Sequence, residues 1–190
     1  MARKLICGAV IAFAITAFAA ADSVRVSLET TMGVVVLELD AAKAPRTVEN
    51  FVAYVNAGHY DGTLFHRVMP GFVVQGGGYE KGLKERPTRP PVPNEANNAL
   101  SNVRGTIAMA RTSDPHSATA QFFINLQDNT RLDHRSETPQ GWGYCVFGRV
   151  VEGLDVVDAI AEVPTAPKGG HGNVPVEDVV LTRAKVVPLA

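Results

Sequence analysis

Short apolar runs separated by Gly, Pro and Asn residues fill the chain from residue 60 onward, and they limit the possible folds more than any other feature. The runs are rich in β-branched and aromatic residues, which favour strands. The expected strands are Leu64–Val68, Phe72–Gln75, Thr106–Ala110, Gln121–Leu126, Tyr144–Val150 and Val179–Val187. Many short strands with few helices predict a mainly β fold, either a barrel or a sandwich.

A β-hairpin is expected ahead of these strands. Ser23–Glu29 alternates polar and apolar residues, so its Val and Leu side chains share one face of a strand. The turn candidate Thr31-Met32-Gly33 follows, and Val34–Leu39 is again strand-like. Two strand patterns joined by such a turn predict an antiparallel hairpin.

Two short helices are expected as well. In Ala44–Gly58 the apolar residues recur at helical spacing, Pro45 suits the first turn, and Gly58 suits the end. Its apolar face consists of Val48, Phe51, Val52 and Val55. A second helix is expected over Leu154–Ile160. Both would cover apolar surface of the sheet.

Three segments between the strands are long enough to carry binding residues. They are residues 77–105, 111–120 and 127–143. Loops held by a rigid sheet commonly form binding sites. Trp142 lies between two glycines, and we expect it to pack its loop onto the domain rather than to contact a partner.

The N-terminal segment differs from the rest of the chain. Arg3 and Lys4 precede Leu5–Ala21, which has no charged residue and ends in small residues. This pattern is typical of a secretory signal peptide. The alternative is an uncleaved membrane anchor, but this apolar stretch is short for a span of about 20 residues.

Cleavage is expected before Ala20 or Asp22. Cleavage before Asp22 would remove residues 1–21 as the signal peptide, and residues 22–190 would form one domain in the periplasm or outside the cell. The chain has 18 basic and 19 acidic residues, and without the two basic residues of the leader its net charge is -3. This balance excludes a general nucleic-acid binder that relies on excess positive charge.

The usual signatures of covalent, metal and nucleotide chemistry are missing from the sequence. Cys7 belongs to the leader, so Cys145 alone remains, and we expect a buried, unreactive thiol there. The five histidines have no metal-ligand spacing. Gly76-Gly77-Gly78 is not followed by a phosphate-loop Lys, and no Gly-x-Ser-x-Gly elbow occurs. We therefore expect no metal and no cofactor.

Two segments stand out instead. Phe65–Gly77 places one cation, Arg67, among apolar side chains. Gln121–Asn125 alternates polar and aromatic residues. Taken alone, the first segment favours a strand, a Pro-Gly turn and a second strand with Arg67 in solvent. The second alone favours a Phe-rich strand facing a core.

In this order the two segments resemble the cyclophilins, a family of peptidyl-prolyl cis-trans isomerases, and the resemblance extends over essentially the whole chain after the leader. It is carried by the opening hairpin, Ala44–Phe51, Phe65–Gly77, Gly105–Ala110, Gln121–Asn125 and Val146–Val150. It implies a closed eight-stranded antiparallel barrel capped by two helices, with the site on its outer face. The leader makes the chain most similar to secreted bacterial members.

The chemistry implied by the resemblance needs neither nucleophile nor cofactor. Resonance opposes rotation of an amide with a barrier of roughly 18–20 kcal/mol. An isomerase has to bind the twisted amide more tightly than either planar form. Twisting localises a lone pair on the prolyl nitrogen, and a permanently protonated arginine can donate a hydrogen bond to it.

The resemblance also assigns roles to residues. Arg67 matches the catalytic arginine, Gln75 orients it, Phe72 forms a wall of the proline pocket, and His66 has a supporting role without proton transfer. The substrate-binding set is Val73, Ala110, Arg111, Gln121, Phe123, Arg131, Leu132 and Tyr144.

Four of these positions depart from the common family pattern. Val73 stands where many members have Met, Arg111 where many have Asn, Tyr144 where His is frequent, and Arg131 where eukaryotic members often have Trp. That Trp is associated with tight cyclosporin binding, so we expect weak cyclosporin affinity. The Asp133–Tyr144 loop is longer than in compact members.

Two other functions stay open at this point. The chain could be a module that holds proline-containing segments without turnover, or a structural barrel in a surface assembly. The isomerase interpretation predicts proline-containing polypeptides as partners. It also predicts no nucleic acid, no stable membrane insertion after cleavage, and a monomer.

Overall fold

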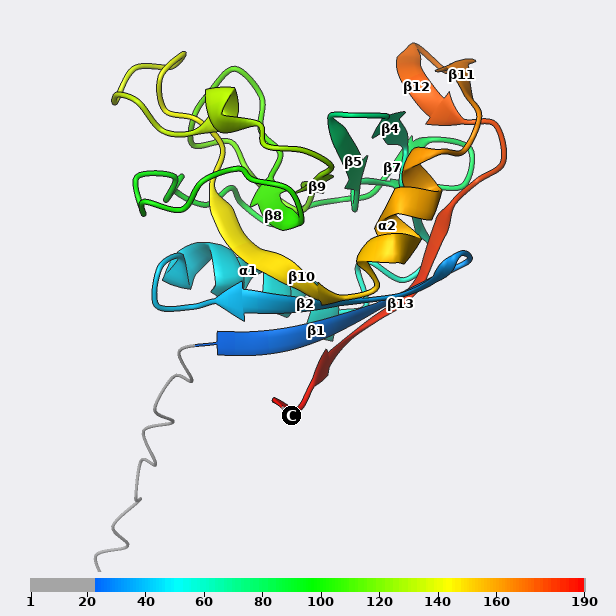
Figure 1. The fold of residues 1–190 in the computed structure, drawn as a ribbon, viewed down its shortest axis with the longest axis horizontal. Helices are drawn as coiled ribbons and strands as arrows, with labels where there is room; N and C mark the ends of the chain where they lie inside the picture. Colours follow the sequence, from blue (N-terminus) through cyan, green and yellow to red (C-terminus); the bar gives the residue numbers. More distant parts are fainter. Residues whose placement is uncertain (1–22, 190) are drawn as a thin grey trace, which may run out of the picture.

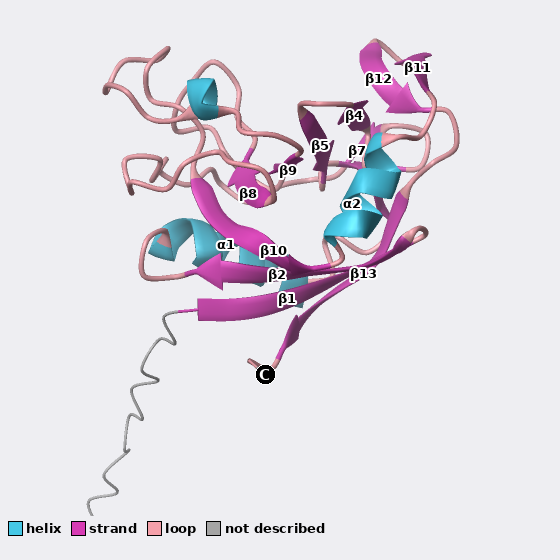
Figure 2. Ribbon diagram, viewed as in Figure 1, coloured by secondary structure: helices cyan, strands magenta, loops and turns pink. Residues whose placement is uncertain are grey.

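The computed structural model describes residues 23–189, which form a strongly curled antiparallel sheet with two helices packed against it (Figure 1). Strands outnumber helices in the described part of the chain, and long loops connect them (Figure 2). The expected mainly β class with two main helices is confirmed. The expected signal peptide lies outside the described residues. Within residues 23–189, no helix has the length and apolar character needed to cross a membrane.

The main sheet has 11 strands whose order in space differs from their order in the chain. That order is β4 (Arg67–Met69), β5 (Val73–Gly76), β9 (Phe122–Asn125), β8 (Thr106–Met109), β10 (Val146–Glu152), β2 (Gly33–Asp40), β1 (Ser23–Thr30), β13 (Val180–Val187), β3 (Thr63–Leu64), β6 (Tyr79–Glu80) and β7 (Lys84–Glu85). Every pairing is antiparallel, so distant segments such as β5 and β9 become neighbours.

The main sheet differs from the closed eight-stranded barrel that the resemblance implied. The first strand of the sheet is β4 and the last is β7. Among the described residues, no hydrogen-bonded ladder joins these two end strands. However, β3 and β4 are separated in the chain by Phe65 and His66 alone. Neither residue belongs to a strand, so the single strand expected over Leu64–Val68 is interrupted there, and both side chains are buried. The chain connects β3 to β4 without strand pairing, so the closed, eight-stranded form of the barrel is not confirmed.

The predicted N-terminal hairpin and its buried face are confirmed. β1 and β2 pair in continuous register from Ser23 opposite Asp40 to Thr30 opposite Gly33. Val26 and Leu28 are fully buried in the core, as the alternating pattern predicted.

Helix α1 (Pro45–Asn56) begins at the proline that the sequence indicated. Its N-terminus has no side-chain cap of its own. Instead, the distant Glu95 accepts hydrogen bonds from the backbone N–H groups of Arg46 at 3.2 Å and Thr47 at 2.8 Å. A carboxylate there satisfies unpaired donors and suits the positive end of the helix. Thus Glu95, from the segment 77–105 that was expected to be a loop, holds the N-terminus of α1 in place.

The two helices enclose the interior of the curled sheet. α1 packs on β13 and β2, while α2 (Leu154–Ala161) packs on β2, β4 and β5 (Figure 1). The Phe51 ring of α1 lies 5.6 Å from the Phe122 ring and 5.2 Å from the Phe147 ring, measured between centroids. This aromatic cluster fills the barrel and makes its strands a rigid support.

Some elements were not predicted from the sequence. A separate two-stranded sheet forms from β11 (Thr165–Lys168) and β12 (His171–Pro175). The short strands β6 and β7 lie in the expected 77–105 loop, and a short 3-10 helix, Thr130–Leu132, lies in the expected 127–143 loop. The β11–β12 hairpin packs beside β4 (Figure 1).

Candidate active site

Two of the expected catalytic side chains, Arg67 and Gln75, lie on strands at one end of the sheet, while His66 and Phe72 directly precede β4 and β5. Arg67 on β4 is opposite Gln75 on β5, and Gln75 is opposite Phe123 on β9. Phe123 is in turn opposite Ala108 on β8. Residues opposite one another project to the same face of a sheet. Pairing alone therefore aligns a cation, an amide and an aromatic ring across three strands.

A chain of hydrogen bonds fixes the polar part of this row. Arg67 Nη1 donates to Gln75 Oε1 at 3.1 Å, and Gln75 Nε2 donates to Gln121 Oε1 at 3.0 Å. Both glutamines are partly buried. Gly78 has no side chain, which leaves room for Gln121: a Cβ at Gly78 would lie 2.5 Å from Cγ of Gln121. Arg67 is therefore held in position before any ligand binds.

Beside Arg67 lies an open cavity of about 370 Å³. Its lining residues are Arg67, Phe72, Val73, Gln75, Ala110, Arg111, Phe123, Leu132 and Tyr144. All of them were expected from the sequence, and the structure brings them together. Val73 and Phe123 belong to a small apolar cluster with Ala108 and Val146, distinct from the main core. We call this cavity the proline cleft, after the role that the resemblance implies for its walls.

A buried amide cluster anchors the loop that supplies Leu132. Asn129 is 2% exposed, and its Nδ2 donates to the carbonyl of Phe72 at 3.0 Å and to Oδ1 of Asn125 at 2.9 Å. The Asn129 carbonyl accepts the N–H of Leu132 at 2.8 Å. Sequence reasoning missed Asn129, because an Asn in an expected loop gives no sign that it is buried.

Loop 133–144 and the Arg111 side chain close one side of the cleft. Arg111 Nε donates to the carbonyl of Gly143 at 2.9 Å, and its guanidinium lies 4.7 Å from the centre of the Tyr144 ring. The Tyr144 ring also meets Phe123 edge-on at 5.7 Å. The two departures at positions 111 and 144 thus support each other through a cation–π contact.

Three expected site residues lie at the margin of the cleft. Arg131 is exposed, and its guanidinium lies 4.8 Å from the centre of the Phe72 ring. His66 and Gln121 instead line a neighbouring cavity of about 360 Å³. Burial lowers the pKa of His66 to about 4, and the nearby His171 acts in the same direction. His66 is therefore neutral at pH 7, which agrees with a supporting role.

The predictions for Cys145 and Trp142 are confirmed. Cys145 is 3% exposed, and burial raises the pKa of its thiol to about 11. A thiol with such a pKa is not a nucleophile at neutral pH. Trp142 is partly buried against the main core, and its Nε1 donates to the carbonyl of Asn94 at 3.2 Å. Its loop is thereby tied to the domain.

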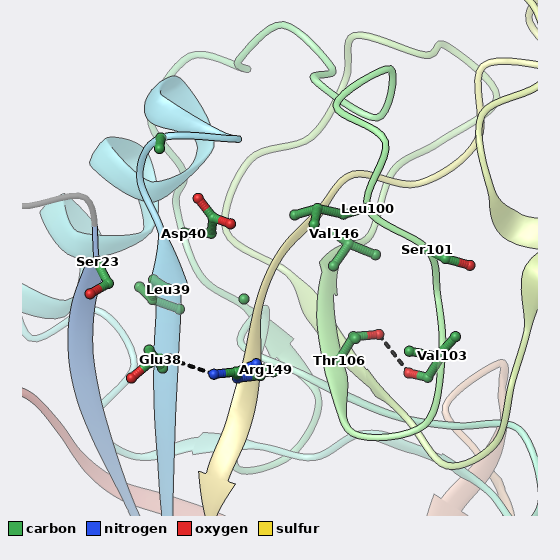
Figure 3. A pocket seen from close by; sticks show the side chains of 12 residues that line it. Ser23, Glu38, Leu39, Asp40, Leu100, Ser101, Val103, Thr106, Val146 and Arg149 are labelled. Carbon is green, nitrogen blue, oxygen red and sulfur yellow. Dashed lines mark hydrogen bonds and ion pairs between the residues drawn. The ribbon is translucent and has the colours of Figure 1, made fainter.

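A larger cavity of about 510 Å³ lies away from Arg67, between the ends of β1 and β2 and the segment before β8 (Figure 3). The charged side chains Glu38 and Arg149 at its edge are paired with each other at 2.9 Å. Val146 lines this cavity and also packs in the cluster that contains Phe123. The cavity therefore adjoins the apolar cluster that contains Phe123, and none of the expected catalytic groups lines it.

Comparisons with known proteins agree with this geometry. Residues 25–186 match the model of the family described as cyclophilin type peptidyl-prolyl cis-trans isomerase. A peptidyl-prolyl cis-trans isomerase of Streptomyces antibioticus is 59% identical over 85% of this chain and 98% of its own length. Peptidyl-prolyl cis-trans isomerase B of Escherichia coli is 53% identical over 85% and 98%. Peptidyl-prolyl cis-trans isomerase A of Dickeya dadantii is 49% identical over 98% and 99%.

Solved structures share the fold at lower identity. A cyclophilin type peptidyl-prolyl cis-trans isomerase of Cryptosporidium parvum, crystallised in the presence of the dipeptide Ala-Pro, superposes with a TM-score of 0.71 at 23% identity. The match covers 87% of this chain and 99% of that one. The family model and the bacterial relatives together establish that the chain belongs to the cyclophilin-type peptidyl-prolyl cis-trans isomerases.

Proposed function

We propose that the protein accelerates cis-trans rotation about Xaa-Pro bonds in polypeptides and so assists their folding. One observation carries the proposal. The guanidinium of Arg67 is fixed by Gln75 at the edge of a cleft whose walls include Phe72, Val73 and Phe123. An apolar recess beside a permanent hydrogen-bond donor suits a proline ring and its nitrogen.

The rotation would be accelerated by preferential binding of the twisted amide. Planar Xaa-Pro bonds offer no lone pair on nitrogen, whereas the twisted bond does. A hydrogen bond from Arg67 would then form fully only in the transition state, which raises the rate. The Gln75 contact keeps the guanidinium in place, so little reorganisation accompanies the step. The apolar walls exclude water and strengthen the hydrogen bond.

A module that merely holds proline segments needs the apolar cleft but not an oriented cation. The hydrogen bonds from Arg67 through Gln75 to Gln121 therefore favour catalysis over simple holding. The partners that follow are proline-containing polypeptides. The dipeptide named with the Cryptosporidium parvum structure belongs to the same chemical class.

We further propose that the protein acts outside the cytoplasm. The support is the apolar, charge-free stretch Leu5–Ala21 after two basic residues. The alignment with the Dickeya dadantii relative covers 98% of the chain and so extends into this stretch. Fractionation of cells followed by N-terminal sequencing tests the proposal. The expected result is a periplasmic or secreted protein beginning at Ala20 or Asp22, and an intact chain in the cytoplasm would contradict it.

The isomerase proposal is tested with a proline-containing peptide and the protein from residue 22, since all described helices and strands lie after that point. We expect the wild type to accelerate isomerisation and Arg67→Ala to lower kcat/KM by about 100- to 1000-fold. Arg149→Ala is the matched control, because it removes an exposed arginine remote from the cleft. Equal rates for wild type and Arg67→Ala would refute catalysis by this site.

A further inference from the structure

The cavity next to the proline cleft is not used by the proposed mechanism. It is lined by His66, Arg67, Gln75, Tyr79, Gln121, Gly170, His171, Gly172 and Asn173. Arg67 and Gln75 line both this cavity and the proline cleft. The two cavities are therefore adjacent, with these two side chains between them, and a polypeptide with its proline in the cleft can continue across them. We call the second cavity the hairpin cavity, because the tip of the β11–β12 hairpin forms one wall.

Three aromatic rings build the fixed part of the hairpin cavity. Tyr79 meets His66 edge-on at 4.6 Å and His171 edge-on at 4.9 Å, measured between ring centroids. His66 is 3% exposed, and its Nδ1 has no hydrogen-bond partner among the described residues. The hairpin is thus joined to the strand that carries Arg67 through ring contacts, and a buried polar atom lies unpaired at their meeting point.

The polar groups of this cavity are mainly donors. Arg67 is a cation, and no carboxylate is among the lining side chains. Gln121 accepts a hydrogen bond from Gln75 through Oε1, which leaves its Nε2 group available to donate. Glu80, next to Tyr79, is already paired with Lys84 and Arg86. An occupant that supplies acceptor oxygens and negative charge therefore complements the cavity.

The hairpin tip leaves space for such an occupant. A Cβ placed on Gly170 or on Gly172 would meet no atom within 4 Å. Gly172 also has an ordinary backbone conformation, whereas Gly170 has a φ of +81°. A side chain can therefore be introduced at Gly172 without backbone strain, which provides a way to fill the cavity by mutation.

We propose that the hairpin cavity is a second subsite that binds an acidic side chain, Asp or Glu, of the same polypeptide whose proline occupies the cleft. This inference rests on the proposed isomerase function and adds a preference to it. His171, Gln121 and Arg67 supply the donors, and Tyr79 supplies the floor against which the side chain packs. The subsite selects clients by a residue within a few positions of the proline.

The test measures kcat/KM on peptides that carry Glu, Ala or Lys at each position from two before to three after the proline. At one position we expect Glu to exceed Lys by about five- to tenfold. Gly172→Phe, which fills the cavity, should bring this ratio to within about twofold of one. Ala166→Phe is the matched control, because Ala166 is exposed on the same hairpin and does not line the cavity. Ala166→Phe should keep the Glu-to-Lys ratio of the wild type.

The ratio between two peptides on one enzyme preparation does not depend on the folded fraction, so partial misfolding cannot imitate the result. His171→Phe provides a second variant, since it keeps a ring beside Tyr79 but removes the donor, and it too should reduce the Glu preference. Equal rates for Glu, Ala and Lys at every position, or a preference that Gly172→Phe leaves intact, would overturn the subsite. A wild type that accelerates no peptide would instead refute the isomerase function itself.

Discussion

The two faces of strands β5 and β9 contain neighbouring residues with different roles. On the inner face, Val74, Phe122 and Ile124 are fully buried in the main core. On the outer face, Val73 and Phe123 form a small separate cluster below the proline cleft. The faces alternate residue by residue along the same strands. The inner face sustains the fold, and the outer face can therefore hold an open cleft without weakening it.

The largest expected effect is a loss of stability, and it tests whether the inner face sustains the fold. Phe122 is fully buried and meets Phe51, Tyr60 and Phe65. Phe122→Ala should lower the free energy of unfolding by about 3–5 kcal/mol, measured by denaturant titration. Phe123→Ala removes the same volume from the outer face, so it should cost less stability and most of the isomerase activity. If Phe123→Ala were the more destabilising change, the division between the faces would be wrong.

The next effect concerns the boundary between the faces, where His66 lies buried between β3 and β4. Its pKa of about 4 is below the ordinary value of 6.5. Between these pH values the unfolded chain binds a proton that the folded chain does not, so stability is lost as the pH falls. The loss should approach about 3 kcal/mol. His66→Asn should flatten the dependence of unfolding free energy on pH between 6.5 and 4, and an unchanged slope would contradict this.

A smaller, graded effect is expected along the hydrogen bonds of the outer face. Gln75 contacts the guanidinium of Arg67, whereas Gln121 contacts only Gln75. Gln75→Ala should lower kcat/KM by about tenfold, and Gln121→Ala by about two- to threefold on a peptide without acidic residues. Neither should lower the free energy of unfolding by more than about 1.5 kcal/mol, the usual contribution of a hydrogen bond. Equal losses for the two variants would show that Gln75 does not act by positioning Arg67.

The smallest effect is expected at the exposed rim. Arg131 lies over Phe72, and such an exposed cation–π contact contributes about 0.5–1 kcal/mol. Arg131→Ala should therefore change kcat/KM by less than about fivefold. A cyclosporin titration of the wild type should give weak inhibition, because Arg131 stands where tight binders of the family often have Trp. Tight inhibition would contradict this prediction.

The sequence predicted regular elements well wherever one side of a segment is buried. The β1–β2 hairpin and α1 follow directly from the spacing of their apolar residues. The β11–β12 hairpin was missed because Pro167, Pro175 and several glycines disfavour a strand prediction. That hairpin is stabilised by packing beside β4, a contact that no local pattern contains.

The candidate site likewise has one part that the sequence predicted and one part that it did not. The resemblance identified the residues of the proline cleft, and the structure brings them together. Neither pattern nor resemblance indicated that Tyr79 and His171 meet beside Arg67, since their proximity depends on how β12 packs against β4. Similarly, the capping of α1 by Glu95 and the burial of Asn129 depend on loops whose paths are set by the whole fold.

The pairing of β1 with β13 brings the two ends of the folded domain together. Arg25 lies opposite Val187, and the start of β1 and the end of β13 lie away from β4, β5 and β9, which carry the cleft (Figure 1). A carrier protein or surface tether attached at either end would therefore leave the cleft open to large, partly folded clients. The same arrangement allows the two ends of the described domain to be joined by a short linker and new ends to be opened elsewhere in the chain.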